Sequence, residues 1–146
     1  MTNGKIPSLV KPGVDTPFHI DYSWWQQNDR EWSVYLRGLL GEELEAKLAE
    51  LGEDQELDWV DPKTGEVRRM GAIQYLLALK FAEGEEQEQG VSMVEAIFRE
   101  FLKNGNTPLS PKALGGILGR PANTILRTLS GARVYRGMRP ILESSE

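Results

Sequence analysis

Six stretches of the chain place apolar side chains at intervals of three and four residues, the spacing that gives a helix one apolar face. Between them lie short segments rich in glycine, proline and charged residues, which are typical of turns and loops. The chain contains no internal repeat. The pattern predicts helices over residues 24–40, 42–51, 71–84, 91–103, 111–118 and 121–130.

Polar residues at the predicted helix starts support these assignments. Asp21 or Ser23 can cap the first helix, because a short oxygen-bearing side chain accepts a hydrogen bond from the first turn. Ser92 is followed three residues later by Glu95, which is the spacing of a capping box. Gly41 is expected to end or kink the first helix before the second begins.

One segment between the predicted helices has the pattern of a β-hairpin. Residues 57–60 and 66–70 flank the loop Asp61-Pro62-Lys63-Thr64-Gly65. Proline early in a loop and glycine late in it favour a tight turn between two strands. The expected fold class is therefore α+β and mainly helical.

Composition suggests boundaries between regions. Residues 1–17 contain three prolines and two glycines and are expected to form a flexible arm. Residues 84–90 carry three glutamates between two glycines and are expected to form an acidic linker. Residues 18–83 would then be a region of helices and one β-hairpin, used for dimerisation or for sensing a signal. Residues 91–142 would form a second compact unit.

The composition also excludes several classes of protein. The chain has no cysteine, which rules out disulfides, thiolate catalysis and cysteine-ligated metal sites. The longest apolar run, residues 73–81, is much shorter than a membrane span and is interrupted by Gln74 and Lys80. The N-terminus lacks the apolar core of a signal peptide. We therefore expect a cytoplasmic protein with no membrane association.

Charge is distributed unevenly along the chain, whose formal net charge is -5. Residues 1–98 contain 9 Lys or Arg and 19 Asp or Glu, whereas residues 99–141 contain 8 Lys or Arg and one Glu. Residues 110–140 hold five arginines and one lysine with no acidic residue. Such asymmetry indicates a basic interaction surface at one end of the molecule. The alternative is that the arginines pair with the acidic half within the fold.

The basic end has the residues of two short helices joined by a tight turn. Ser110 and Pro111 favour a helix start, with a cap followed by proline at the first helical position. Gly119 suits a turn with left-handed backbone. Gly115 lies where two crossing helices leave room only for a small side chain, and Ile125 lies where the second helix packs back on the first. Leu114 and Leu118 are expected to complete the core of this pair.

These positions resemble the helix-turn-helix of bacterial transcriptional regulators. With the predicted helix 91–103 and the segment that follows residue 131, the basic end resembles a winged-helix domain. The wing is short in this resemblance, because residues 133–141 supply one strand or a truncated hairpin around Gly137. The chain as a whole resembles small bacterial proteins of unassigned function.

The resemblance implies that the second helix is a recognition helix that enters the major groove of DNA. Its outward positions are Asn123, Thr124 and Arg127, with Arg120 at the turn. Arginine pairs bidentately with guanine and asparagine with adenine. Thr124 can bond phosphate or contact a thymine methyl, and the helix N-terminus itself favours a phosphate.

A second set of candidate contacts follows the recognition helix. Arg133, Arg136 and Arg139 recur every three residues, with Tyr135 between the first two. On a strand or loop they are expected to clamp the DNA backbone, which contributes affinity without reading sequence. The alternative for each arginine is an ion pair with a carboxylate of the same chain.

The leading hypothesis is a DNA-binding protein, either a small transcriptional regulator or a nucleoid-associated factor. A homodimer on double-stranded DNA is expected, because one helix-turn-helix reads few base pairs. The main alternative is a protein-interaction module whose basic end docks an acidic partner, including a second copy of this chain. RNA binding through Tyr135 and its neighbouring arginines is a weaker possibility. His19 is the only histidine, and no catalytic, metal or cofactor site is expected.

Overall fold

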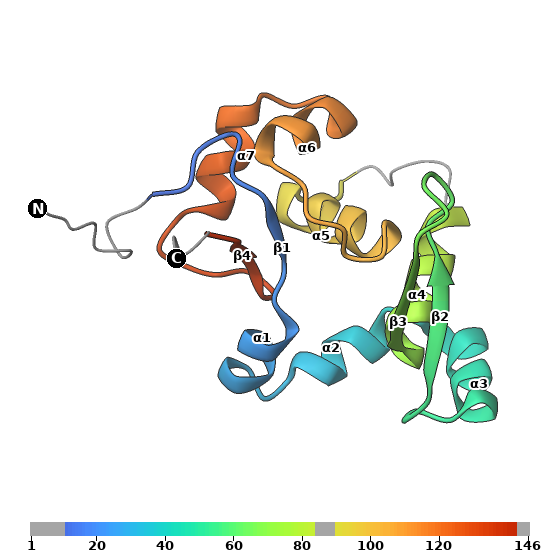
Figure 1. Cartoon of the computed structure of the whole chain (residues 1–146). Helices are drawn as coiled ribbons and strands as arrows, with labels where there is room; N and C mark the ends of the chain where they lie inside the picture. The colour runs from blue at the N-terminus through green and yellow to red at the C-terminus, as the bar shows by residue number, and fades with distance from the viewer. Residues whose placement is uncertain (1–10, 84–89, 143–146) are drawn as a thin grey trace, which may run out of the picture.

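The computed structural model describes residues 11–83 and 90–142 of the 146-residue chain. Within these ranges the fold is α+β and mainly helical, as the sequence predicts, with short antiparallel strands (Figure 1). In chain order the elements are β1 (Phe18–Ile20), α1 (Tyr22–Asn28), α2 (Trp32–Gly38), α3 (Gly41–Leu51), β2 (Glu56–Val60), β3 (Val67–Gly71), α4 (Ala72–Glu83), α5 (Met93–Lys103), α6 (Pro111–Leu118), α7 (Ala122–Leu129) and β4 (Met138–Pro140).

The single helix predicted over residues 24–40 is wrong, because the chain breaks between α1 and α2. The backbone at Asp29 is extended, and its carboxylate accepts hydrogen bonds from the Trp25 indole at 3.0 Å and from the Glu31 amide at 2.9 Å. An aspartate that bonds nearby N–H groups in this way offers the backbone an alternative to the helix. Trp25 and Trp32 nevertheless lie on the same core, with ring centroids 6.2 Å apart. The apolar spacing therefore continues across the break.

The predicted hairpin is present as strands β2 and β3, which pair antiparallel with Val60 opposite Val67. Helix α4 follows β3 directly. We call α3, β2, β3 and α4 the hairpin lobe; they lie together at the right of Figure 1. Where the lobe meets the loop after α5, the Trp59 ring covers Gly105, at which a Cβ would lie 2.6 Å from that ring. Arg68 donates to the Gly105 carbonyl at 3.0 Å in the same contact.

A second small sheet joins the beginning and the end of the described chain. Strand β1 pairs antiparallel with β4, Phe18 lying opposite Pro140. On its other side, Phe18 exchanges backbone hydrogen bonds with Leu109 at 2.9 and 3.0 Å. The Asn106 side chain also bonds both the amide and the carbonyl of Ile20. The residues after α7 thus form one strand whose partner is N-terminal, rather than a truncated hairpin around Gly137.

One buried cluster of side chains joins these elements, from Phe18 in β1 to Met138 in β4. Helix α5 lies at its centre, between the hairpin lobe and the α6–α7 pair in Figure 1, and contacts α4, α6, α7 and β1. Its start is capped by Ser92, whose hydroxyl accepts the Glu95 amide at 3.1 Å, as the capping-box spacing predicts. The residues most deeply buried on α5 are Ile97, Phe98, Phe101 and Leu102.

The N-terminal arm and the acidic linker are described only in part. Residues 1–10 of the first and 84–89 of the second lie outside the described residues. Within residues 11–17, the Val14 carbonyl accepts the Lys112 amide of α6 at 3.0 Å, and the Pro17 carbonyl accepts the Ile141 amide at 2.8 Å. No helix in the described part of the chain is long and apolar enough to cross a bilayer.

Candidate nucleic-acid interface

The basic end contains two short helices, α6 and α7, joined by a tight turn at the positions that the sequence predicts. Helix α6 begins after Ser110, whose hydroxyl accepts the Ala113 amide at 3.1 Å, and Pro111 occupies its first turn. Gly119 ends the helix in the left-handed conformation, with φ 70°. Glycine adopts this conformation without the steric cost that a Cβ imposes. The chain turns there and enters α7 after Pro121.

Close packing fixes the two helices against each other. A Cβ at Gly115 would lie 2.6 Å from the Arg120 carbonyl oxygen and 3.4 Å from the Ala122 amide nitrogen, so only glycine fits there. Leu114 and Ile125 are fully buried between the helices. Leu118, the other predicted core position, is partly buried against the same cluster. The turn is therefore held by backbone contact as well as by apolar packing.

The outward side of this unit carries three of the predicted contact residues. Arg120 at the turn and Asn123 and Arg127 on α7 are exposed. Asn123 and Arg127 are four residues apart on α7, which places them on one helix face, and Arg120 precedes the helix in the turn. Among the described residues, neither Arg120 nor Arg127 forms an ion pair. The pair of guanidinium groups is therefore available to an external anion.

Thr124 is the fourth predicted contact residue of this unit, and it is less exposed than the other three. It is half-buried, with its backbone carbonyl accepting the Thr128 hydroxyl at 3.0 Å. Helix α7 lacks a side-chain cap, because Pro121 occupies the cap position. Backbone N–H groups at the start of a helix that lacks such a cap favour an anionic ligand. Thr124 lies in this first turn.

We call residues 130–142 the C-terminal segment; its predicted contact residues divide into two kinds. Arg133 is exposed and lies over the Tyr135 ring, with its guanidinium carbon 5.3 Å from the ring centroid. Arg136 and Arg139 instead form ion pairs with carboxylates of other elements. The sequence is compatible with either a DNA contact or an ion pair for each arginine, and the structure places Arg136 and Arg139 in ion pairs within the fold.

Arg136 belongs to a network around Glu95 of α5. The Glu95 carboxylate accepts from Arg136 at 2.7 Å, from Arg99 at 2.8 Å and from the Tyr35 hydroxyl at 2.8 Å. Its side chain is only 14% exposed. The Arg136 guanidinium also stacks over the rings of Tyr35 and Phe98, at 4.6 and 5.7 Å. The network thus fastens the C-terminal segment to α2 and α5.

Titration of these groups reflects their surroundings. Burial alone would raise the pKa of Glu95, but the hydrogen bonds from Arg99 and Tyr35 and the charge of Arg136 outweigh it. The pKa of Glu95 therefore lies below its ordinary value, and the carboxylate is ionised at neutral pH. Burial and the hydrogen bond to Glu95 raise the pKa of Tyr35 to about 12. The phenol therefore remains a hydrogen-bond donor.

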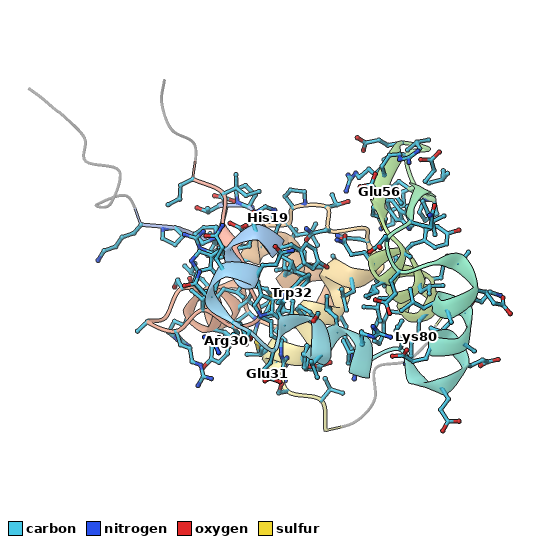
Figure 2. All side chains as sticks on the ribbon, turned by 90° about the horizontal axis from the view of Figure 1, so that it is seen from below. His19, Arg30, Glu31, Trp32, Glu56 and Lys80 are labelled. Atoms are coloured by element: carbon cyan, nitrogen blue, oxygen red, sulfur yellow. The ribbon has the colours of Figure 1, made fainter. Side chains whose placement is uncertain are left out.

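Arg139 fastens the same segment to α1. It donates to Asp21 at 3.1 Å and lies over the Trp24 ring at 5.3 Å. Across the sheet it lies opposite His19, which is labelled in Figure 2. Burial, together with the positive charge of Arg139, lowers the pKa of His19 below 6.5 in spite of the Asp21 carboxylate. His19 is therefore neutral at pH 7.

The sequence predicts helices α6 and α7 and the turn between them, but not the Glu95 network. Glu95 and Arg136 are 41 residues apart, and the capping-box spacing gave the glutamate a different role. The available signal was the i to i+4 spacing of Glu95 and Arg99, which is typical of an ion pair on a helix.

Comparison of the chain with protein-family models, with curated proteins and with solved structures finds no match.

Proposed function

We propose that this protein binds double-stranded DNA through α6 and α7, with α7 as the recognition helix. The observation that carries the proposal is that two arginines of this helix pair are exposed and lack ion pairs. Arg120 in the turn and Arg127 on α7 are exposed and form no ion pair with the rest of the described chain. Exposed arginines on a helix that can enter a groove are the usual means of contact with DNA.

The proposed contacts have distinct roles. Arg120, Arg127 and Asn123 face the major groove, where arginine pairs with guanine and asparagine with adenine. Thr124 and the first turn of α7 bind a phosphate. Arg133 binds the backbone beside the groove, which positions the protein without reading sequence. Arg136 and Arg139 contribute positive potential while their ion pairs with Glu95 and Asp21 hold the C-terminal segment in place.

We further propose that the protein acts as a homodimer, as a small transcriptional regulator or a nucleoid-associated factor. One α7 covers a few base pairs, and a second copy doubles the length of DNA that is read. The sheet of β1, β4 and Leu109 takes the place of the wing in the winged-helix arrangement. The hairpin lobe is rich in carboxylates, and DNA repels such a surface. The lobe would therefore lie away from the duplex, where it can contact the second copy.

A titration of fluorescently labelled mixed-sequence duplex DNA, followed by anisotropy at two salt concentrations, tests the proposal. Arg120→Ala combined with Arg127→Ala should weaken binding at least about tenfold, because each lost base or phosphate contact costs about 1–3 kcal/mol. On mixed-sequence DNA, which lacks a specific site, the two arginines contact phosphates instead of bases, so the slope of log affinity against log salt should fall by about one for each arginine removed. Circular dichroism should show an unchanged fold, because both side chains are exposed.

The matched control removes the same charge from the other end of the molecule. Lys47→Ala combined with Lys63→Ala changes two exposed side chains of the hairpin lobe, for which the described structure shows no ion pair. This variant should bind DNA like the wild type. Equal weakening by both double variants would reduce the effect to net charge and remove the recognition-helix assignment. Absence of DNA binding by the wild type at low salt would instead favour docking of an acidic protein on the basic end.

A further inference from the structure

A pocket of about 450 Å³ opens between the α1–α2 connection and the C-terminal segment. This volume lies in the range of about 300–1,000 Å³ that is usual for small-molecule sites. The connection supplies one wall and residues 133–136 supply the other. Figure 2 labels Glu31 at this connection, beside Arg30 and Trp32.

The two walls carry opposite charges. Asp29 and Glu31 line the pocket from the connection, and Arg133 and Arg136 line it from the C-terminal segment. Glu31 and Arg133 form no ion pair with the described chain. Arg136 uses one nitrogen, Nη1, for Glu95, and the described residues provide no hydrogen-bond acceptor for the other two. The pocket therefore offers acceptors on one side and donors on the other.

Three aromatic residues and Val134 form the remainder of the lining. Trp25, Tyr35 and Tyr135 come from α1, α2 and the C-terminal segment respectively. The Trp25 indole N–H is already bonded to Asp29, and the Tyr35 hydroxyl to Glu95. Trp25 is only 2% exposed, so the ring surface open to a ligand comes from the half-buried Tyr35 and Tyr135. Apolar or aromatic atoms pack favourably on such a surface.

We infer that this pocket binds a small zwitterion with an aromatic side chain, a molecule of the aromatic amino-acid class. A carboxylate would bind the Arg133 and Arg136 guanidinium groups, and an ammonium would bind Asp29 and Glu31. A ligand with only negative charge would face the two carboxylates, and a ligand with only positive charge would face the two arginines. Either mismatch places like charges close together, which is unfavourable.

The pocket lies directly beside the residues that follow the recognition helix. Arg133 is four positions beyond the last residue of α7, and Arg133 is also a proposed backbone contact. A ligand carboxylate that engages this arginine withdraws it from DNA. The zwitterion would therefore act as an effector that weakens DNA binding, and this second step rests on the proposed function.

Three commercially available probes separate the contributions of the two charges. L-phenylalanine carries both charges, 2-phenylethylamine lacks the carboxylate, and 3-phenylpropionate lacks the ammonium. Isothermal titration calorimetry of the full chain without DNA should give L-phenylalanine a dissociation constant on the order of 0.1–1 mM. Each of the other two should bind at least about tenfold more weakly, since a hydrogen bond between charged groups is lost.

Variants assign the binding to this pocket. Arg133→Ala and Glu31→Gln change one exposed side chain on each wall and should each weaken L-phenylalanine binding at least about tenfold. Arg30→Ala is the matched control, since Arg30 is exposed, adjacent to Glu31 and outside the pocket lining. It should leave the affinity unchanged.

The results separate this inference from the proposed function. No heat from L-phenylalanine up to roughly 10 mM, or equal affinity for all three probes, would overturn the zwitterion site whether or not the protein binds DNA. Where L-phenylalanine binds, the DNA titration is repeated at a saturating concentration. A lower DNA affinity for the wild type, absent in Arg133→Ala, supports the effector role. Unchanged DNA affinity would overturn that role and leave the ligand site intact.

Discussion

The helix-turn-helix and the hairpin lobe differ in what their arginine side chains contact. In the hairpin lobe and next to it, Arg68 and Arg69 pair with carboxylates of the same hairpin, and Arg37 pairs with Glu45 and Glu53 of the α3 region. On the helix-turn-helix, Arg120 and Arg127 have no such partner among the described residues. The arginines in and next to the hairpin lobe therefore form ion pairs with nearby carboxylates. Arg120 and Arg127 are available to bind an external anion.

The C-terminal segment lies between these two cases. Arg136 and Arg139 are paired, but with carboxylates of α5 and the residue that caps α1 rather than with local neighbours. Arg133 is unpaired. The comparison shows that charge along a sequence does not by itself identify a binding surface. What distinguishes the regions is whether the fold brings a carboxylate to each guanidinium, which depends on residues far apart in the chain.

The largest expected effect on stability concerns the close contact between α6 and the turn before α7. Gly115→Ala should lower the free energy of unfolding by about 2–3 kcal/mol, because its Cβ meets the Arg120 carbonyl and forces the turn open. The backbone cannot move aside as a flexible side chain would. The same variant should weaken DNA binding, because Arg120 is displaced with the turn. Urea denaturation measures the first effect and anisotropy the second.

Gly116→Ala is the control for that experiment. It lies in the same helix, and a Cβ there meets nothing within 4 Å. Alanine restricts the unfolded chain more than glycine does, so this variant should raise the free energy of unfolding by about 0.5–1 kcal/mol. Effects of the same sign at both positions would mean that α6 and α7 do not approach closely at Gly115.

The part of the fold that the sequence predicts is the part governed by local rules. A serine cap, proline in the first turn and glycine at the turn locate α6 and α7 without knowledge of the rest. The break at Asp29 was missed because Trp25 and Trp32 point to the same core on both sides of it. Apolar spacing reports which face is buried, and it does not report whether the helix is continuous.

The pairing of distant segments could not be predicted from one sequence. Strand β1 is three residues long, too short for a pattern, and β4 lies more than 115 residues further along the chain. The same holds for the candidate site. The exposure of Asn123 and Arg127 follows from helical spacing and that of Arg120 from its place in the turn, whereas the ion pair of Arg136 depends on a glutamate brought close only by the fold.

The second expected effect concerns the paired arginines. Glu95→Gln removes the charge that Arg99, Arg136 and Tyr35 share, and should lower the free energy of unfolding by about 1–2 kcal/mol at pH 7. The pKa of Glu95 is lowered in the folded state from its ordinary 4.5, so its stabilising contribution is present above that pH. The contribution is lost as the pH falls through the folded-state pKa. The stability difference between the two proteins should therefore shrink in acid.

Urea titrations of both proteins at a series of pH values between neutral and acid measure that difference. Glu100→Gln, on the same helix, serves as the control, because the described structure shows no ion pair or side-chain hydrogen bond for Glu100. Its difference from the wild type should be small at every pH. A difference for Glu95→Gln that stays constant into acid would show that the carboxylate is not held ionised by its neighbours.

The smallest expected effect tests a positive charge of the hairpin lobe that serves the fold. Lys80, labelled in Figure 2, donates to the carbonyls of Leu39 and Leu40 at the end of α2. A cation at a helix C-terminus stabilises by about 0.3–1 kcal/mol and salt screens it, so Lys80→Met should cost about 0.5 kcal/mol at low ionic strength and less at high. Lys47→Met, on the exposed side of α3, should cost less than Lys80→Met at both. Since neither lysine lies on α6 or α7, DNA affinity should not follow these changes. Lys80→Met could instead lose as much DNA affinity as the double variant of Arg120 and Arg127. A lysine bonded to backbone carbonyls would then contribute to DNA binding as much as arginines without ion pairs. That result would contradict the difference between the two regions.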